Sequence, residues 1–282
     1  MGNGMPDGGA AAYPRASWRL LLHGERDGAS NMAIDEAILE AVIGGHSLPT
    51  LRFYGWSPPC LSLGRNQPLA EADRAACRAA GVDLVRRPSG GQAVLHAGEL
   101  TYSVALLGSD PRSAGGVPEG YRRLSEGLLA GLRRLGIEAV QALGTRQADG
   151  PPSPICFDRP SDYEITVNGR KLIGSAQWRR RGGVLQHGSL PLSGDLTRIV
   201  DLVVLGERDP EEERRRLARR MVSLEEARGQ AISFAVTAQG LAQGLAATLH
   251  LVLVPGELSP GEQARAAELR SRYAGEAWTA RA

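Results

Sequence analysis

The segment around Asn168-Gly169 constrains the fold of this chain most strongly. Residues 162–167 carry the β-branched and aromatic side chains that strands favour, and residues 170–179 follow directly after the Asn-Gly pair. Both positions of a two-residue hairpin turn need positive φ, which asparagine and glycine adopt readily. We therefore predict a β-hairpin here, followed by a further strand over 184–192.

Strand patterns continue upstream of this hairpin, whereas the C-terminal third is mainly helical in pattern. Six further strands are expected, over 18–22, 50–56, 60–63, 82–86, 93–96 and 100–107. Helices are expected over 30–43, 70–80, 118–135, 195–205, 210–219, 233–250 and 260–273. In the first helix Asn31 is the expected N-cap, Asp35 and Glu36 suit the early turns, and Gly44 ends it. This distribution predicts an α+β layout.

The composition is that of an ordinary soluble globular protein. Its 282 residues are 42% hydrophobic and 23% charged, enough for a sizeable core. A net charge of +2 gives no broad basic field, so nucleic acid is not expected as a partner. No apolar run is long enough to span a bilayer, and the Gly/Ala/Pro-rich N-terminus lacks a signal-peptide pattern. We predict a cytoplasmic protein with a disordered tail over 1–16 and no membrane partner.

The three cysteines, Cys60, Cys77 and Cys156, are an odd number at wide spacings. This argues against a disulfide framework and against a zinc site, so no metal is expected. Each cysteine is then either a catalytic or a buried thiol. We interpret Cys60, at the start of a strand, and Cys77, on an Ala-rich helix, as buried. Cys156 follows a Pro-rich loop and fits either role.

Lysine is nearly absent from this chain. Of its 33 lysines and arginines, Lys171 is the only lysine. An ammonium on this strand could donate to a substrate carbonyl and stabilise developing negative charge, although chance survival of one surface lysine is the alternative. Strand alternation would place Lys171, Ile173 and Ser175 on one face, and Gly174 permits close approach of a ligand. If Cys156 lies nearby, the ammonium would also favour its thiolate.

Two further segments carry candidate binding residues. The Gly-Gly pair at 90–91 follows a strand and could point backbone amides at a ligand, although an ordinary tight turn explains it equally well. The neighbouring Arg86 and Arg87 could pair with an anion, but a solvated strand end is the default interpretation. His96 and His187 are possible proton handlers near pH 7, with structural histidines as the alternative.

Several segments together resemble the lipoate-protein ligase and octanoyltransferase superfamily. The matching segments are 86–96 with 98–104, 163–177 with 185–189, and, more loosely, 52–56 with 63–67. The resemblance spans about residues 18–250. It implies a single mixed domain built on a bent, largely antiparallel sheet with flanking helices, as in biotin- and lipoate-protein ligases. Residues 17–254 would form the catalytic domain, and 255–282 a helical extension of the same domain.

Three features favour the transferase branch of this superfamily over the ligases. The segment 154–157, Pro-Ile-Cys-Phe, resembles the octanoyltransferase branch, whose acyl-accepting cysteine lies just before the Tyr-Glu strand. Only about 30 residues follow Val254, too few for the additional C-terminal domain that many ligases carry. Gln92 and Ala97 also stand where ligases tend to have glycine and aspartate.

The resemblance therefore implies an acyltransferase of lipoate biosynthesis, an octanoyl-[acyl carrier protein]:protein N-octanoyltransferase. Cys156 would take the octanoyl group from octanoyl-acyl carrier protein as a thioester, and a lysine of a lipoyl domain or of the glycine-cleavage H protein would receive it. Lys171, which corresponds to the lysine that contacts the acyl carbonyl in ligases and transferases alike, would be the second catalytic residue. No cofactor would be needed, because a thioester stores enough free energy to form the amide. The expected substrate-binding residues are Arg87, Ser89, Gly90, Gly91, His96, Gly174, Ser175 and His187.

Other expectations concern the acyl slot and the partners. Val94, Leu95 and Ile173 are expected to wall an apolar slot for the acyl chain. An ATP-dependent lipoate-protein ligase and a non-catalytic carrier-binding module are the alternative functions. We expect a monomer that docks acidic carriers through a basic tip at 179–181, with a solvated hairpin tip as the alternative.

Overall fold

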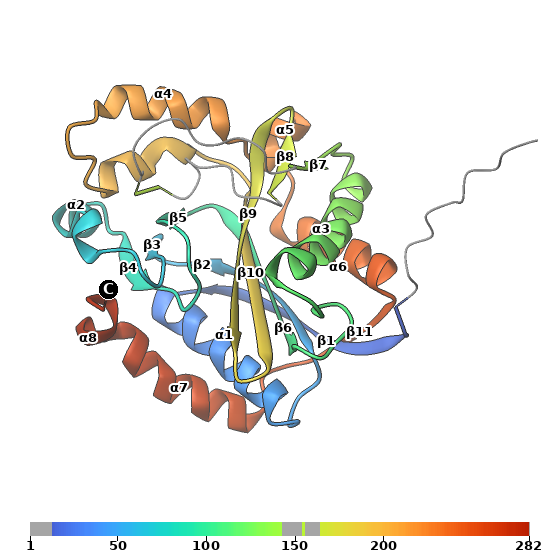
Figure 1. Ribbon diagram of the computed structural model, residues 1–282. Coiled ribbons are helices and arrows are strands. Elements are labelled where there is room, and N and C mark those ends of the chain that lie inside the picture. The colour runs from blue at the N-terminus through green and yellow to red at the C-terminus, as the bar shows by residue number, and fades with distance from the viewer. Residues whose placement is uncertain (1–12, 143–153, 156–163, 282) are drawn as a thin grey trace, which may run out of the picture.

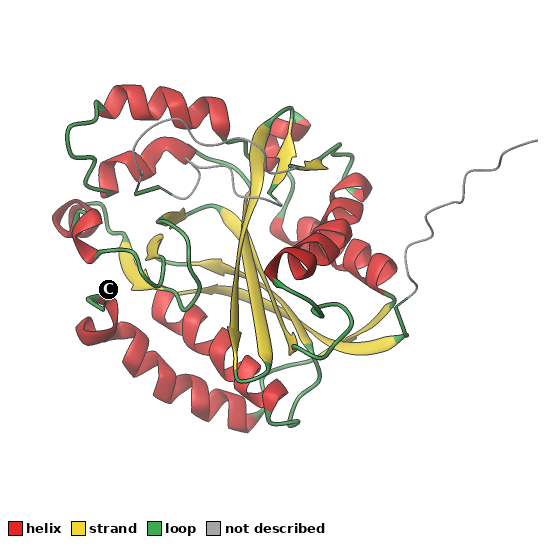
Figure 2. Ribbon diagram, in the orientation of Figure 1, coloured by secondary structure: helices red, strands yellow, loops and turns green. Residues whose placement is uncertain are grey.

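The computed structural model describes residues 13–142, 154–155 and 164–281. Most of its strands form one sheet in the order β11-β1-β2-β6-β10-β9-β8-β7, with helices around it (Figures 1 and 2). The strands are β1 (Ala16–Arg26), β2 (Thr50–Trp56), β6 (Glu99–Leu107), β7 (Val140–Gln141), β8 (Ile165–Val167), β9 (Arg170–Arg180), β10 (Gly183–Pro191) and β11 (Leu251–Pro255). β1 pairs in parallel with β2 and β11, and all other neighbours in this sheet are antiparallel. The predicted α+β class with a largely antiparallel sheet is confirmed.

The predicted hairpin is present between β8 and β9. Its Asn-Gly turn at 168–169 has φ values of 50° and 75°. The register shifts after the first residue of β8, so that β9 carries one extra residue there. Because a one-residue shift moves side chains to the other face, Lys171 does not share a face with Ile173 and Ser175 by simple alternation. That expectation is wrong, and Ile173 packs in the core.

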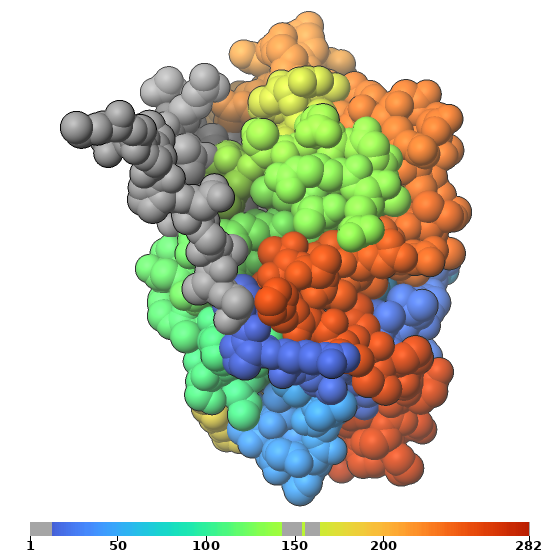
Figure 3. All heavy atoms as spheres, turned by 90° about the vertical axis from the view of Figure 1, so that its right-hand side faces the viewer, coloured from blue at the N-terminus to red at the C-terminus, as the bar shows by residue number. Residues whose placement is uncertain are grey.

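Two helical layers cover the main sheet. The layers are α1 (Gly28–Ile43) with α7 (Pro260–Ala274) on one face, and α3 (Val117–Arg134) with α6 (Phe234–Leu249) on the other. Figure 3 shows α3 and α6 side by side, in green and orange. Along β6, Tyr102 and Val104 join the core with α3 and α6, while Ala105 joins the core with α1. Strand alternation therefore directs Thr101 and Ser103 to the α1 side, where polar groups gather.

Helix α1 is enclosed between the sheet and α7, so it is buried on most of its surface and not only along one stripe. Asp27 caps its N-terminus by accepting from the Ser30 amide, so the expectation of Asn31 as the cap is wrong. Asn31 lies inside the helix, and its side-chain amide donates to the carbonyl of Gly55 on β2. Asp35, one turn later, likewise needs its partners from the sheet.

A second sheet, of three strands, lies beside the main one and has its own small core. Its strand order is β4 (Asp83–Arg86), β3 (Cys60–Leu63), β5 (Val94–His96). The remaining elements are η1 (Leu69–Glu71), α2 (Arg74–Ala79), η3 (Leu196–Leu202), α4 (Pro210–Arg220), α5 (Leu224–Arg228) and α8 (Glu276–Thr279). Cys60 and Cys77 are free and buried, as predicted, and burial raises the pKa of both thiols.

Both ends of the described chain join the main cores. Part of the predicted tail belongs to the fold: β1 begins at Ala16, and the buried Arg112 donates to the carbonyl of Pro14. Residues 1–12 lie outside the described part. From the other end, Leu269 and Tyr273 of α7 pack in the core with α1. Within the described ranges, no helix combines the length and apolar character that crossing a membrane requires.

Candidate active site

A cavity of about 480 Å³, here called the main cavity, opens between the two sheets. Its described lining residues are Met32, Tyr54, Trp56, Ser62, Arg87, Gly90, Gly91, Gln92, Val94, His96, Thr101, Val117, Pro118, Tyr121, Gly174, Ser175, Ala176, Gln177, His187, Gly188 and Ser189. Seven of the eight predicted substrate-binding residues are among them. The eighth, Ser89, does not line the cavity but is hydrogen-bonded to His187, which does. A concave, mostly apolar wall with a few polar groups is typical of a small-molecule site.

Two backbone segments meet at one edge of the main cavity. A Cβ on Gly64 would lie 1.8 Å from the carbonyl oxygen of Gly91, so only glycine permits this approach. Arg87 braces the same loop, because its guanidinium donates to the carbonyls of Gly90 and Gln92. The Gly-Gly pair is therefore a packed part of the cavity wall.

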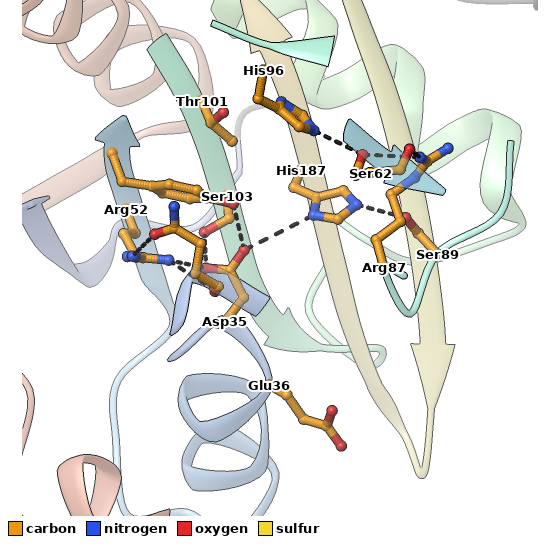
Figure 4. A network of polar contacts seen from close by, with 12 residues as sticks. Asp35, Glu36, Arg52, Ser62, Arg87, Ser89, His96, Thr101, Ser103 and His187 are labelled. Atoms are coloured by element: carbon orange, nitrogen blue, oxygen red, sulfur yellow. Dashed lines mark hydrogen bonds and ion pairs between the residues drawn. The ribbon is translucent and has the colours of Figure 1, made fainter. Parts of the chain in front are cut away.

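His187 is held between a carboxylate and a hydroxyl, as Figure 4 shows. Its Nε2 lies 2.6 Å from the Ser89 hydroxyl, and its Nδ1 lies 3.9 Å from a carboxylate oxygen of Asp35. Burial lowers the pKa of His187, and this outweighs the opposite effect of Asp35. The imidazole is therefore neutral near pH 7, and from the cavity wall it can take up a proton.

Asp35 lies beside His187 and also forms a buried ion pair with Arg52. Its carboxylate accepts from Arg52 Nη1 at 2.7 Å and from the hydroxyls of Tyr54 and Ser103, each at 2.8 Å. Burial acts to raise the pKa of Asp35, but Arg52 and then His187 outweigh it and hold the pKa below its ordinary value. The sequence pattern indicates only a charge in the early turns of a helix at Asp35 and does not predict this role. The available signal was Arg52, a charge inside an apolar strand that needs a buried counter-charge.

His96 has a similar arrangement. Its Nδ1 lies 2.8 Å from Glu99 Oε1 and its Nε2 lies 2.8 Å from the Ser62 hydroxyl. The ring stacks on Trp56 with 3.9 Å between centroids. Burial acts to raise the pKa of Glu99, but His96 and two further hydroxyl donors hold it below its ordinary value. His96 is thus fixed on both edges and one face, which favours a positioning role in the cavity wall.

We expect the protein to lose stability as the pH falls from 6.5 towards 4, because His23 must stay neutral. Arg52 Nε donates to His23 Nδ1 at 2.9 Å. Burial and the Arg52 guanidinium lower the pKa of His23 from 6.5 to about 4. Between these values the unfolded chain binds a proton that the folded chain does not, so the free energy of unfolding falls with pH across this window.

Urea unfolding at about pH 7.5 and about pH 5 measures this loss. His23→Gln keeps an acceptor for Arg52 but does not titrate, so it should reduce the difference between the two conditions. Part of the difference in stability between the two pH values should remain in this variant, because burial also lowers the pKa of His187. An unchanged difference in His23→Gln would exclude His23 as its source.

Cys156 lies outside the described residues, but the structure describes Ile155, the residue directly before it. Ile155 is buried and forms a parallel bridge with Ala93. Both neighbours of Ala93 in the chain, Gln92 and Val94, line the main cavity. The chain therefore runs beside this cavity at position 155.

Lys171 is buried, and its ammonium pairs with the carboxylate of Glu164 at 2.5 Å. It is not among the residues that line the main cavity, whereas Gly174 and Ser175 on the same strand are. Contact between Lys171 and Cys156 stays a prediction. Of the three residues expected to form the acyl slot, Val94 lines the main cavity and the other two do not.

Several arginines have structural partners that the sequence did not indicate. Arg86 and Arg87 are buried, so their interpretation as a solvated strand end is wrong. Arg86 donates to the carbonyls of Gly64 and Thr279, which connects α8 to the cavity loop. At the predicted basic tip, Arg179 donates to three carbonyls at 113–116.

Comparison with known proteins identifies the family of this chain. Residues 27–246 match the lipoyl protein ligase A/B catalytic domain. Octanoyltransferase LipM of Kyrpidia tusciae is 43% identical over 271 residues, covering 94% of this chain and 99% of that protein. Octanoyltransferase LipM of Moorella thermoacetica is 44% identical over 276 residues, covering 95% and 99%.

The fold is also that of a solved structure, titled as a bi-partite lipoate protein ligase and its E2 lipoyl domain, from Thermoplasma acidophilum. The TM-score is 0.80 at 23% identity, and the match covers 95% of this chain and 98% of that one. The predicted superfamily and its fold are confirmed. The chain belongs to the lipoyl protein ligase A/B catalytic-domain family and, within it, to the LipM octanoyltransferases.

Proposed function

We propose that this chain carries an octanoyl group as a thioester on Cys156. The donor is octanoyl-acyl carrier protein, and the acceptor is a lysine of a lipoyl domain or of the glycine-cleavage H protein. The observation that carries the proposal is the bridge between Ile155 and Ala93, whose neighbours line the main cavity. Ile155 directly precedes Cys156 in the sequence, and this bridge is therefore what supports a thioester site at the main cavity.

The main cavity suits an acyl chain of medium length. Its volume of about 480 Å³ lies in the range of small-molecule sites, and Trp56, Val94 and Ala176 contribute apolar surface. Each buried methylene contributes about 0.8 kcal/mol, so an eight-carbon chain binds more tightly than a four-carbon chain. We assign stabilisation of the oxyanion to backbone amides near Gly91 and Gly174. Lys171, which pairs with Glu164 and does not line the main cavity, would contribute only through its charge.

The reaction has two steps, each with one bond made and one broken. The Cys156 thiolate attacks the thioester carbonyl, and the tetrahedral adduct expels the carrier thiolate, which then takes up a proton. The neutral amine of the acceptor lysine next attacks the octanoyl-Cys156 carbonyl, loses a proton and expels the Cys156 thiolate. His187 is the base that we assign to this proton, because it is neutral and lines the main cavity, with Asp35 and Ser89 beside its two ring nitrogens.

Intact-mass measurement after mixing the protein with octanoyl-acyl carrier protein, without ATP, tests the proposal. We expect one added octanoyl group that hydroxylamine removes and that moves to a lipoyl domain on its addition. No adduct from this donor, together with acylation of the lipoyl domain only from octanoate and ATP, would replace the transferase by a ligase. Binding of carriers with no acylation under either condition would leave a carrier-binding module.

We expect Gly64→Ala to lower kcat/KM for octanoyl transfer by at least about tenfold. The new Cβ cannot remain 1.8 Å from the Gly91 carbonyl oxygen, so the cavity loop must move. A displacement of about 1 Å in a catalytic site can cost about 100-fold in rate. Gly24→Ala on β1 is the matched control, because its Cβ meets nothing within 4 Å. Normal transfer by Gly64→Ala would show that this loop is not part of the working site.

A further inference from the structure

A second cavity, of about 400 Å³, is lined mainly by arginine and tryptophan. We call it the arginine cavity after Arg65, Arg179, Arg180, Arg272 and Arg281. Glu36 is the only acidic residue among its described lining residues, which leaves an excess of four positive charges. The whole chain carries a net charge of only +2, so the fold has concentrated positive charge here from separate segments.

Several of these arginines are held in place by neighbouring groups. The buried carboxylate of Glu36 pairs with Arg180 at 2.8 Å and also with Arg272. The guanidinium of Arg180 lies over Trp178, 5.3 Å from the ring centroid, and that of Arg272 lies over Trp278 at 4.8 Å. Cationic groups fixed in this way lose little side-chain entropy when they bind a ligand.

Most of the positive charge in the arginine cavity has no acidic partner among the residues that the structure describes. In the described part of the chain, Arg65 and Arg281 are exposed and neither forms an ion pair. Arg179 is hydrogen-bonded to carbonyls, which leaves its charge uncompensated. Several guanidinium groups around a concave space match the geometry of a phosphate, which each can bind through two N–H groups.

Residues of the same elements line the arginine cavity and the main cavity, so the two cavities lie close to each other. On α1, Met32 lines the main cavity and Glu36 lines the arginine cavity, and residues four apart on a helix lie about 5–6 Å from each other. On β9, Ala176 lines the main cavity, and Trp178, two residues further along on the same face, lines the arginine cavity. Arg65 directly follows the glycine that packs against the main-cavity loop. A ligand could therefore occupy both cavities.

We infer that the arginine cavity binds the phosphate of the prosthetic arm that presents the octanoyl thioester on the donor carrier. This rests on the proposed function, because an acyl carrier protein holds its thioester at the end of a pantetheine arm joined through a phosphodiester. With the octanoyl thioester in the main cavity, the arm runs along α1 and β9 towards the arginine cavity, where its phosphate meets the guanidinium groups. The acceptor lysine bears no phosphate, so this site distinguishes the donor from the acceptor.

Calorimetric titration of the full chain with 4′-phosphopantetheine and with pantetheine tests the site directly. We expect the phosphorylated arm to bind at least about tenfold more tightly, and the double variant Arg65→Gln/Arg281→Gln to lose this preference. These two arginines are chosen because replacing Arg180 or Arg272 would leave the Glu36 carboxylate short of a partner. Arg122→Gln, an exposed arginine on α3 that does not line the arginine cavity, should bind like the wild type. Equal binding of both compounds to the wild type overturns the inference.

Acylation of Cys156 separates this inference from the proposed function. At limiting donor, we expect octanoyl-4′-phosphopantetheine to acylate the wild type at least about tenfold faster than octanoyl-pantetheine. Equal rates would remove the phosphate site and leave the transferase standing. Tight binding of the phosphorylated arm without any acyl-enzyme would remove the transferase and keep the phosphate site. A defect of the double variant that appears only with the complete carrier protein would assign the arginines to an acidic protein surface and overturn the inference.

Discussion

We expect Cys156→Ser to form no octanoyl adduct and to transfer octanoate at least about 10³-fold more slowly than the wild type. The thiolate is the nucleophile in the proposed first step, and a serine hydroxyl at the same position is almost wholly protonated near pH 7. The substitution removes the nucleophile without adding bulk. Intact mass after exposure to octanoyl-acyl carrier protein reports the first step, and octanoylation of a lipoyl domain reports both.

The other two cysteines supply the control for this experiment. Cys60 and Cys77 are buried, and burial raises the pKa of both thiols, so neither is reactive near neutral pH. Cys77→Ala should therefore still form the adduct on Cys156. Wild-type transfer by Cys156→Ser would rule out the covalent intermediate, and an adduct lost in Cys77→Ala with the fold intact would place the nucleophile elsewhere.

Local patterns predicted most strands and helices, but not how the strands assemble. The Asn168-Gly169 turn is where the sequence indicated it, because turn chemistry depends on a few adjacent residues. The parallel pairing of β11 with β1 joins opposite ends of the chain, and no local pattern encodes it. The division of strands between two sheets is a similar long-range choice. β11 itself was missed, because it follows directly on α6 and its apolar residues extend the helical pattern.

The sequence predicted those site residues whose chemical type is informative by itself. It did not predict those whose position depends on the register of a strand. His96, His187 and the Gly-Gly loop, all expected to bind substrate, line one cavity, and their role in binding stays a prediction. The register shift in β9 removed the simple alternation on which the placement of Lys171 depended. Asp35 was missed because its partners come from strands that are distant in the sequence, and a carboxylate early in a helix has an adequate local explanation.

We expect Asp35→Asn to destabilise the protein by about 3–5 kcal/mol, because it leaves the buried guanidinium of Arg52 without its counter-charge. The side chains of Asp35 and Arg52 are at most 1% exposed. Every group that donates to Asp35, from Arg52, Tyr54 and Ser103, would have to share one remaining carbonyl oxygen and would face an amide that is itself a donor. The measurement is the free energy of unfolding in urea at pH 7.

A surface ion pair provides the contrast for Asp35→Asn. Asp201 pairs with Arg214 but its side chain is 59% exposed, so Asp201→Asn should cost no more than about 1 kcal/mol. Asp35→Leu/Arg52→Met removes both buried charges together and should recover part of the lost stability, since it leaves no unpaired ion. If Asp35→Asn unfolds at the same urea concentration as Asp201→Asn, the buried pair does not hold α1 against the sheet, and the orientation of His187 must come from Ser89 alone.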